Sequence, residues 1–162
     1  MMGEHRLLSE WLADNYFGRT WHMQYRVGAD PDAAGVRFEN DAERRLARNF
    51  NRWIDAIVEP PDKLVVIEAT MYRATEKIGR LQEYLLLLRA SPDWSRWSSW
   101  PLEPTLLTAQ DDPVAAELCR RLGFRYVFYE PPWIDEWWTV YPDRRRRAPS
   151  AGLVDALRQL ST

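Results

Sequence analysis

The chain of 162 residues has the length of one domain and is too short for a second large core. Charged residues make up 28% of the chain and the formal net charge is only -2, which excludes a uniformly basic surface for nucleic acid or for an anionic membrane. The longest apolar stretch, 84–88, is far shorter than the about 20 residues that cross a bilayer, and a single cysteine, Cys119, excludes an internal disulfide. We therefore expect an intracellular or virion protein with no membrane partner.

The N-terminal part of the sequence predicts a helix followed by a strand. Apolar residues recur at helical spacing over 4–17, and Gly18 is placed to end that helix. Residues 20–27 alternate between polar and large side chains, which is typical of a strand. One face of that strand would carry Trp21, Met23, Tyr25 and Val27. The charged run 41–48 favours a short helix, and an extension of a strand is the alternative.

Two apolar segments around Pro60-Pro61 each carry one carboxylate in their interior. Residues 53–58 and 64–70 predict two strands, with Asp55 in the first and Glu68 in the second. A buried charge in a strand is costly, so it usually has a function. If the turn pairs Glu59 with Leu64, Asp55 lies opposite Glu68, and the other face is wholly apolar. That apolar face would consist of Ile54, Ala56, Val58, Val65, Ile67 and Ala69.

The rest of the chain alternates between helices and strands. Helices are predicted over 73–89 and 113–122, and strands over 104–109 and 124–129. Gly79 inside the first of these helices suggests a close approach to the sheet. The alternation predicts an α/β single-domain sandwich, in which helices flank a central mixed sheet whose antiparallel part comes from the early strands.

The composition changes near Trp138, so we expect a compact domain over 1–138 and an extension over 139–162. The extension holds an arginine run and, over 151–160, apolar residues at the spacing of a short docking helix. Large aromatic residues often anchor interfaces, and arginines often contact phosphates. Candidate contacts to a partner or to DNA are therefore Trp133, Trp137, Trp138, Arg144, Arg145, Arg146 and Arg147. For the arginines, an exposed charge run is the simpler interpretation.

Asp55 and Glu68 form the candidate chemical site. Facing carboxylates would lie about 5 Å apart at Cβ, so both ionise readily only with a cation between them. Mg²⁺, which prefers oxygen ligands, is the natural ion. A nuclease would also need a cation two residues after Glu68, where this chain has Thr70, and Lys77 in the next helix is the alternative lysine.

The simpler interpretation of the two carboxylates is structural. Asp55 and Glu68 would then be a relic site, or a pair satisfied by Arg73, Arg52 or backbone donors. This interpretation needs no cofactor.

The two acids resemble the signature of the PD-(D/E)XK nuclease-like superfamily, an acid on one strand and Glu-x-Lys on the next. Asp55 and Glu68-Ala69-Thr70 stand in those positions, with Thr70 in the place of the lysine. Small phage-encoded members resemble the chain further in four segments, Ile67–Thr70, Gly79–Tyr84, Asp111–Pro113 and Pro131–Trp133. Gln82 and Tyr84 are similar to the Gln and Tyr of the RecB-like branch. The resemblance implies a restriction-endonuclease-like fold.

Because the chain lacks the lysine of the signature, the resemblance implies a catalytically degenerate domain. Such a domain would serve as a structural virion component, in the neck or head–tail connector of a bacteriophage. Such a protein would be made in the bacterial host cytoplasm and would join other phage structural proteins in an oligomeric assembly. The first alternative is an active Mg²⁺-dependent DNA endonuclease, with Asp55 and Glu68 as metal ligands and Lys77 as a migrated lysine. The second alternative is a subunit that binds DNA ends without cleaving them.

Overall fold

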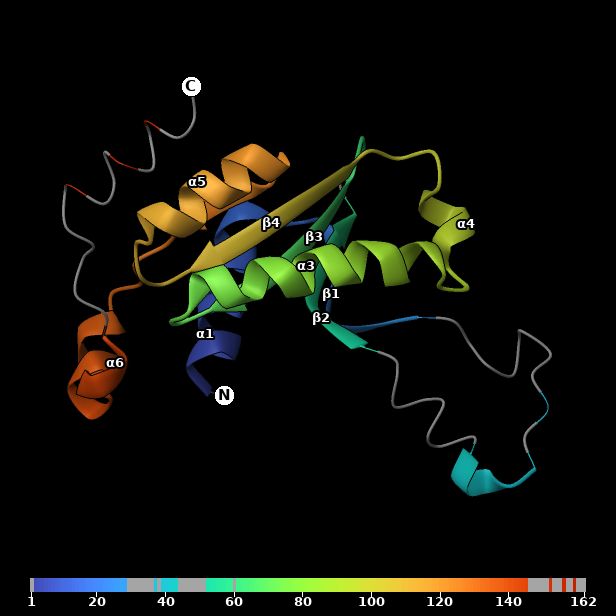
Figure 1. The fold of residues 1–162 in the computed structure, drawn as a ribbon, viewed down its shortest axis with the longest axis horizontal. Coiled ribbons are helices and arrows are strands. Elements are labelled where there is room, and N and C mark those ends of the chain that lie inside the picture. The colour runs from blue at the N-terminus through green and yellow to red at the C-terminus, as the bar shows by residue number, and fades with distance from the viewer. Residues whose placement is uncertain are drawn as a thin grey trace.

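Helices flank a five-stranded mixed sheet in the computed structural model, which describes residues 2–28, 37, 39–43, 52–59, 61–145, 152, 156 and 159 (Figure 1). The strands are β1 (Thr20–Val27), β2 (Arg52–Glu59), β3 (Leu64–Thr70), β4 (Leu102–Thr108) and β5 (Arg125–Phe128). The helices are α1 (Met2–Asn15), α3 (Ala74–Arg89), α4 (Trp94–Trp97), α5 (Pro113–Leu122), α6 (Ile134–Val140) and the 3-10 helix η1 (Pro142–Arg144). The predicted helices and strands that lie within the described residues are confirmed to within a few residues at each end.

The sheet has the strand order β1-β2-β3-β4-β5. The pairs β1–β2 and β2–β3 are antiparallel, and the pairs β3–β4 and β4–β5 are parallel. Parallel neighbours need a crossover, and α3 and α5 supply the two crossovers. The α/β prediction with an antiparallel early part is therefore confirmed.

Both faces of the sheet are buried. On one face, α1 and α6 pack on Ala56, Val58, Val65 and Ile67. On the other face, α3 and α4 pack on Ile54, Ile57 and Val66, while α5 joins the first turns of α3 over β4. Figure 1 shows this layering, with α3 and α5 in front of the sheet and α1 behind it. β3 is the central strand and every one of its residues is buried.

The turn residues place α5 as the sequence predicts. The Asp112 carboxylate accepts hydrogen bonds from the backbone N–H groups of Val114 and Ala115 at 3.1 and 3.0 Å, and Pro113 starts the helix. These contacts satisfy donors that a helix leaves open at its first turn. Gly123 ends the helix with φ of 69°, a conformation that favours glycine.

The β2–β3 register is the predicted one, but β2 becomes irregular at Asp55. Ala56 pairs with Ile67, Ile57 with Val66 and Val58 with Val65, so the count places Asp55 opposite Glu68. The expectation that Ile54 shares a face with Ala56 is wrong, because Ile54 packs on the α3 side and Ala56 on the α1 side. The same change of face separates Met23 from Tyr25 in β1. The break in alternation thus falls at the level of the candidate site.

The ordered chain continues beyond Trp138. Trp133 and Trp138 are buried in the core under α1, with exposed fractions of 8% and 5%, so they are not available as partner anchors in this structure. η1 follows α6, and the Arg144 guanidinium stacks on Tyr72. Arg146, Arg147 and most of the runs 41–48 and 151–160 lie outside the described residues. Within these two runs, 41–43, 152, 156 and 159 are described and are helical. None of the helices in the described part is long and apolar enough to cross a membrane.

The expected close approach of the sheet at Gly79 is wrong, because a Cβ at this exposed position would meet no atom within 4 Å. Gly79→Ala is therefore expected to raise the free energy of unfolding by about 1 kcal/mol, since alanine loses less conformational entropy in a helix. Urea denaturation measures the change. Gly123→Ala is the control, because its open surroundings are the same but its φ of 69° disfavours alanine. A destabilised Gly79→Ala variant would contradict the open surroundings.

Candidate functional site

Lys77 reaches the candidate site from α3. Its Nζ donates a hydrogen bond to Glu68 Oε1 at 2.9 Å, and the two groups form an ion pair. The pair is well shielded, since the side chains are 15% and 1% exposed. Lys77 lies in the first turn of α3, which runs back across the sheet from the end of β3, so the helix brings the lysine over the strand that carries Glu68.

The surroundings of Glu68 disfavour its charge. Burial, and after it the charge of Asp55, raise the pKa of Glu68 to about 7, although Lys77 and Arg80 act in the opposite direction. The second carboxylate oxygen of Glu68, Oε2, is buried and has no hydrogen-bond partner. Burial by itself would lower the pKa of Lys77, but the charges of Glu68 and Glu4 outweigh it and the pKa is raised. The lysine therefore keeps its proton at neutral pH.

Asp55 links β2 to β3 at the point where the regular backbone pairing of these two strands ends. Its Oδ2 accepts a hydrogen bond from the backbone N–H of Ala69 at 2.9 Å. Its Oδ1 faces the Gln24 side-chain amide at 3.4 Å. The first contact confirms the expectation that backbone donors satisfy part of the pair. It also fixes the Asp55 carboxylate beside β3, one residue from Glu68.

Gln24 takes a strained backbone conformation opposite Asp55. Its φ is 53°, in the left-handed region that non-glycine residues rarely adopt. The β1–β2 ladder pairs Met23 with Ala56 and Tyr25 with Ile54, and the step between them, Gln24 with Asp55, is not paired. Such strain costs about 1–3 kcal/mol and clusters at functional sites. In this protein the strained residue is Gln24, whose side-chain amide faces Asp55.

A cavity of about 460 Å³ opens over Gln24, Asp55 and Lys77, and the buried Glu68 does not line it. Its polar lining comes from α1, β1, β2 and α3 and consists of Glu4, His5, Gln24, Asp55, Lys77 and Arg80. Leu8 and Met23 form an apolar part of the wall. The cavity is large enough for a phosphate group with its neighbouring sugar, and it presents two cationic side chains, Lys77 and Arg80, beside the carboxylates of Glu4 and Asp55.

Thr70 serves the backbone and not the cavity. Its hydroxyl donates to the backbone carbonyl of Tyr72 and accepts from the Tyr72 N–H at 3.1 Å, which closes the turn after β3. Tyr84 is buried on the α3 side, and burial, followed by the charges of Glu68 and Asp55, raises its pKa to about 12. Gln82 is exposed and does not line the cavity.

The two arginines considered as partners of the carboxylates pair elsewhere. Arg73 forms an ion pair with Glu76 at 3.6 Å, and Arg52 with Glu83 at 3.2 Å. The expectation that either arginine satisfies the Asp55–Glu68 pair is wrong, because the ion pair of Glu68 is with Lys77. Their partners Glu76 and Glu83 lie on the exposed surface of α3, whereas Lys77 lies on the helix face that covers the sheet.

The donor set fits Mg²⁺. Proteins usually hold this ion by one or two carboxylates, and water and substrate phosphates complete its shell. Asp55 and Glu68 supply two carboxylates, and the unpartnered buried Oε2 of Glu68 is the kind of atom that a cation would satisfy. Among the described residues no group of three or more His, Cys, Asp and Glu side chains is arranged to hold a metal ion, at this site or elsewhere.

Comparison of the chain with protein-family models, with curated proteins and with solved structures found no match. The resemblance to the PD-(D/E)XK superfamily therefore rests on the sequence motifs alone.

The cavity also contains residues that the sequence did not single out. Arg80 lies three residues after Lys77, so helical spacing alone could have placed it on the same side of α3. Glu4 and His5 come from α1, and Gln24 from β1. No local signal indicates these three, because their approach to Asp55 depends on how α1 packs and on the β1–β2 register.

Gln24 gives a test of the site that separates strain from chemistry. We expect Gln24→Gly and Gln24→Ala to lower the activity proposed below by about tenfold each, since both remove the amide that faces Asp55. Only the glycine relieves the φ of 53°, so Gln24→Gly should also be more stable than Gln24→Ala by about 1 kcal/mol. Cleavage rates and urea denaturation measure the two effects. Full activity in both variants would contradict a positioning role.

Proposed function

We propose that the chain is a Mg²⁺-dependent deoxyribonuclease with a restriction-endonuclease-like fold, in which Lys77 replaces the lysine missing at Thr70. The observation that carries this proposal is the contact of Lys77 Nζ with Glu68 Oε1 at 2.9 Å, next to Asp55 and under an open cavity. A threonine at position 70 removes the lysine from the strand but not from the site. The resemblance in motifs and the mixed α/β sheet support the same proposal.

Each residue has a role that its contacts allow. Asp55 and Glu68 would hold the ion, which when bound would polarise the scissile phosphate and lower the pKa of a water molecule. Lys77 keeps its proton and would donate a hydrogen bond to the negative charge that develops on the phosphate. Arg80 lines the same cavity and offers a second cationic donor to a phosphate oxygen. Gln24 orients Asp55 through its amide.

A cleavage assay tests the proposal. Purified protein is incubated with linear duplex, nicked and single-stranded DNA in Mg²⁺, in Mn²⁺ or in EDTA. We expect cleavage with the metals and none in EDTA. Asp55→Asn and Glu68→Gln should each lower the rate by at least about 100-fold, because both keep the size of the side chain but remove a metal-binding charge.

The control is Glu117→Gln, a neutralised carboxylate on α5 that pairs with Arg120 and Arg121 and does not line the cavity. This variant should cleave at the wild-type rate. Absence of cleavage on all three DNA forms would refute the enzyme. Cleavage that persists in both site variants would indicate a contaminating nuclease.

A second candidate function is that of a structural virion component in the phage neck, and an exposed apolar edge favours it. β1 is an edge strand of the sheet. Phe17 lies in the turn before β1, Trp21 in β1 and Trp53 in the neighbouring strand β2, and these residues are 91%, 36% and 54% exposed. Edge strands with exposed aromatic residues offer unpaired backbone groups and apolar area to a neighbour. Such an edge suits permanent contact with another phage structural protein.

Particle fractionation tests this second candidate. A structural component should copurify with complete phage particles in a constant ratio to the other neck proteins. A protein found only in the host lysate and missing from purified particles would refute a virion role. The cleavage assay and the fractionation are independent, so each candidate stands or falls by its own measurement.

A further inference from the structure

Aromatic rings and guanidinium groups alternate at the α6 end of the molecule. We call the group of Tyr72, Arg73, Trp137, Tyr141 and Arg144 the aromatic–arginine patch. The Arg144 Cζ lies 5.1 Å from the centre of the Tyr72 ring and 4.9 Å from that of Tyr141. Trp137 packs on Tyr141 at 4.7 Å and is stacked with Tyr72 at 6.4 Å. Arg73 covers Tyr72 at 5.8 Å.

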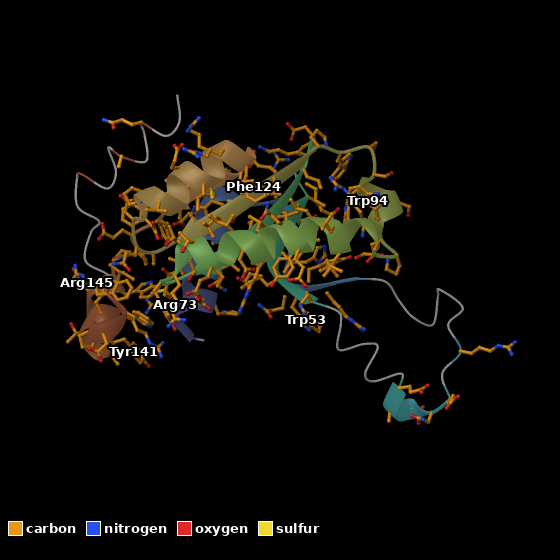
Figure 2. The ribbon with its side chains drawn as sticks, viewed as in Figure 1. Trp53, Arg73, Trp94, Phe124, Tyr141 and Arg145 are labelled. Carbon is orange, nitrogen blue, oxygen red and sulfur yellow. The ribbon has the colours of Figure 1, made fainter. Side chains whose placement is uncertain are left out.

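The patch borders an open cavity of about 580 Å³. Trp137, Tyr141 and Arg144 line it together with Arg6, whose Cζ lies 4.5 Å from the centre of the Trp133 ring. Tyr141 is 40% exposed and the neighbouring Val140 67%, so ring surface is accessible to a ligand. Figure 2 shows Arg73, Tyr141 and Arg145 at this same end of the molecule, far from Trp94 and Phe124.

The guanidinium groups of the patch are available to a phosphate. Among the described residues no carboxylate pairs with Arg144, whose guanidinium lies over the rings of Tyr72 and Tyr141. Arg73 and the adjacent Arg145 pair with Glu76 at 3.6 Å and with Asp135 at 3.9 Å, and both arginine side chains are 60% exposed. Exposed ion pairs contribute little to stability, so a phosphate can compete with the two carboxylates for these arginines.

The patch adjoins the candidate site through two shared elements. In α1, Gly3 and Arg6 line the patch cavity, whereas Glu4 and His5 line the site cavity. A helix is only about 10–12 Å wide with its side chains, so a few nucleotides span both cavities. Tyr72 and Arg73 also form the connection between β3, which carries Glu68, and α3, which carries Lys77.

We propose that the aromatic–arginine patch binds single-stranded DNA next to the cleavage site. Partly exposed rings stack on bases only where the bases are unpaired, and guanidinium groups bind the phosphates between them. A duplex hides the faces of its bases and would gain only the phosphate contacts. The position of the scissile phosphate rests on the proposed nuclease function, but strand binding by the patch does not.

Fluorescence anisotropy with a labelled 12-nucleotide oligothymidine in EDTA tests the patch without cleavage. We expect Arg144→Gln and Tyr141→Ala each to weaken binding by about tenfold, as the loss of one stacked contact does. Arg144→Gln should also reduce the slope of log K against log salt by about 0.7, the value for one phosphate contact on a single strand. The matched control is Arg96→Gln, because Arg96 lies over Trp97 at 5.4 Å in α4, away from the patch.

The outcomes separate the patch from the enzyme. Binding that falls in the two patch variants but not in Arg96→Gln supports the patch, even if wild-type protein cleaves no DNA. Cleavage by the wild type together with unchanged oligothymidine binding in both variants overturns the proposal that the patch binds single-stranded DNA. The proposed nuclease function would still stand. Equal losses in all three variants, or no binding by wild type, also overturn it. Arg144 is exposed, so Arg144→Gln stays informative if Tyr141→Ala does not fold.

Discussion

Replacing Lys77 by methionine is expected to lower Mg²⁺-dependent cleavage by at least about 100-fold and to destabilise the protein by about 3 kcal/mol at pH 8. Methionine keeps the length of the side chain but removes the ammonium group that contacts Glu68 at 2.9 Å. The buried carboxylate then has neither of its oxygens paired by a cation, and an uncompensated buried charge is costly. Cleavage rates and urea denaturation at pH 8 measure the two effects.

Two further variants distinguish chemistry from stability. Lys77→Met combined with Glu68→Gln should recover most of the lost stability, since no buried charge remains, but no activity. Lys77→Arg keeps a charge in place of the ammonium and should be more stable than Lys77→Met. A Lys77→Met variant that cleaves at the wild-type rate would show that the lysine only neutralises Glu68.

The contribution of Glu68 to stability is expected to fall by about 3 kcal/mol as pH rises from 4.5 to 7. The pKa of this carboxyl is raised from 4.5 to about 7 by burial and by the charge of Asp55. Below pH 4.5 both the folded and the unfolded chain hold the proton, so the contribution is complete. Between 4.5 and 7 the unfolded chain releases the proton while the folded protein retains it, and the difference in stability is lost. Above pH 7 the carboxyl of Glu68 is ionised in both the folded and the unfolded chain, so its contribution no longer changes with pH.

The difference between wild type and Glu68→Gln isolates this effect, because all other titrating groups are the same in both proteins. Free energies of unfolding at several pH values between 4 and 8 measure it. The pKa of Lys77 is raised above 10.5, so the lysine adds a contribution that is lost only at higher pH. Mg²⁺ should raise the melting temperature at pH 8 more than at pH 5, since it competes with the proton on Glu68. A pH-independent difference between the two proteins would contradict a raised pKa.

Much of the fold follows from local patterns. The apolar runs of β2 and β3, the helical spacing in α3, and the Pro113 and Gly123 signals of α5 place these elements within a few residues. The β2–β3 register was predictable because a short turn joins the strands and only one register separates the carboxylates from the apolar face. The helix α6 was not predicted, because its seven residues are too few to show a helical repeat of apolar positions. It forms by packing on α1.

The sequence by itself determined that two acids face each other in a central hairpin, that no lysine follows Glu68 by two residues, and that Lys77 is the candidate for the missing cation. These results depend on alternation and spacing, which act between near neighbours in the chain. Only the tertiary structure decided that Lys77 reaches Glu68, that Gln24 is strained opposite Asp55, and that Trp133 and Trp138 belong to the core. The last two depend on the packing of segments far apart in sequence, and the first depends on how α3 turns back over β3. In each, the surroundings of one side chain are set by the position of another element.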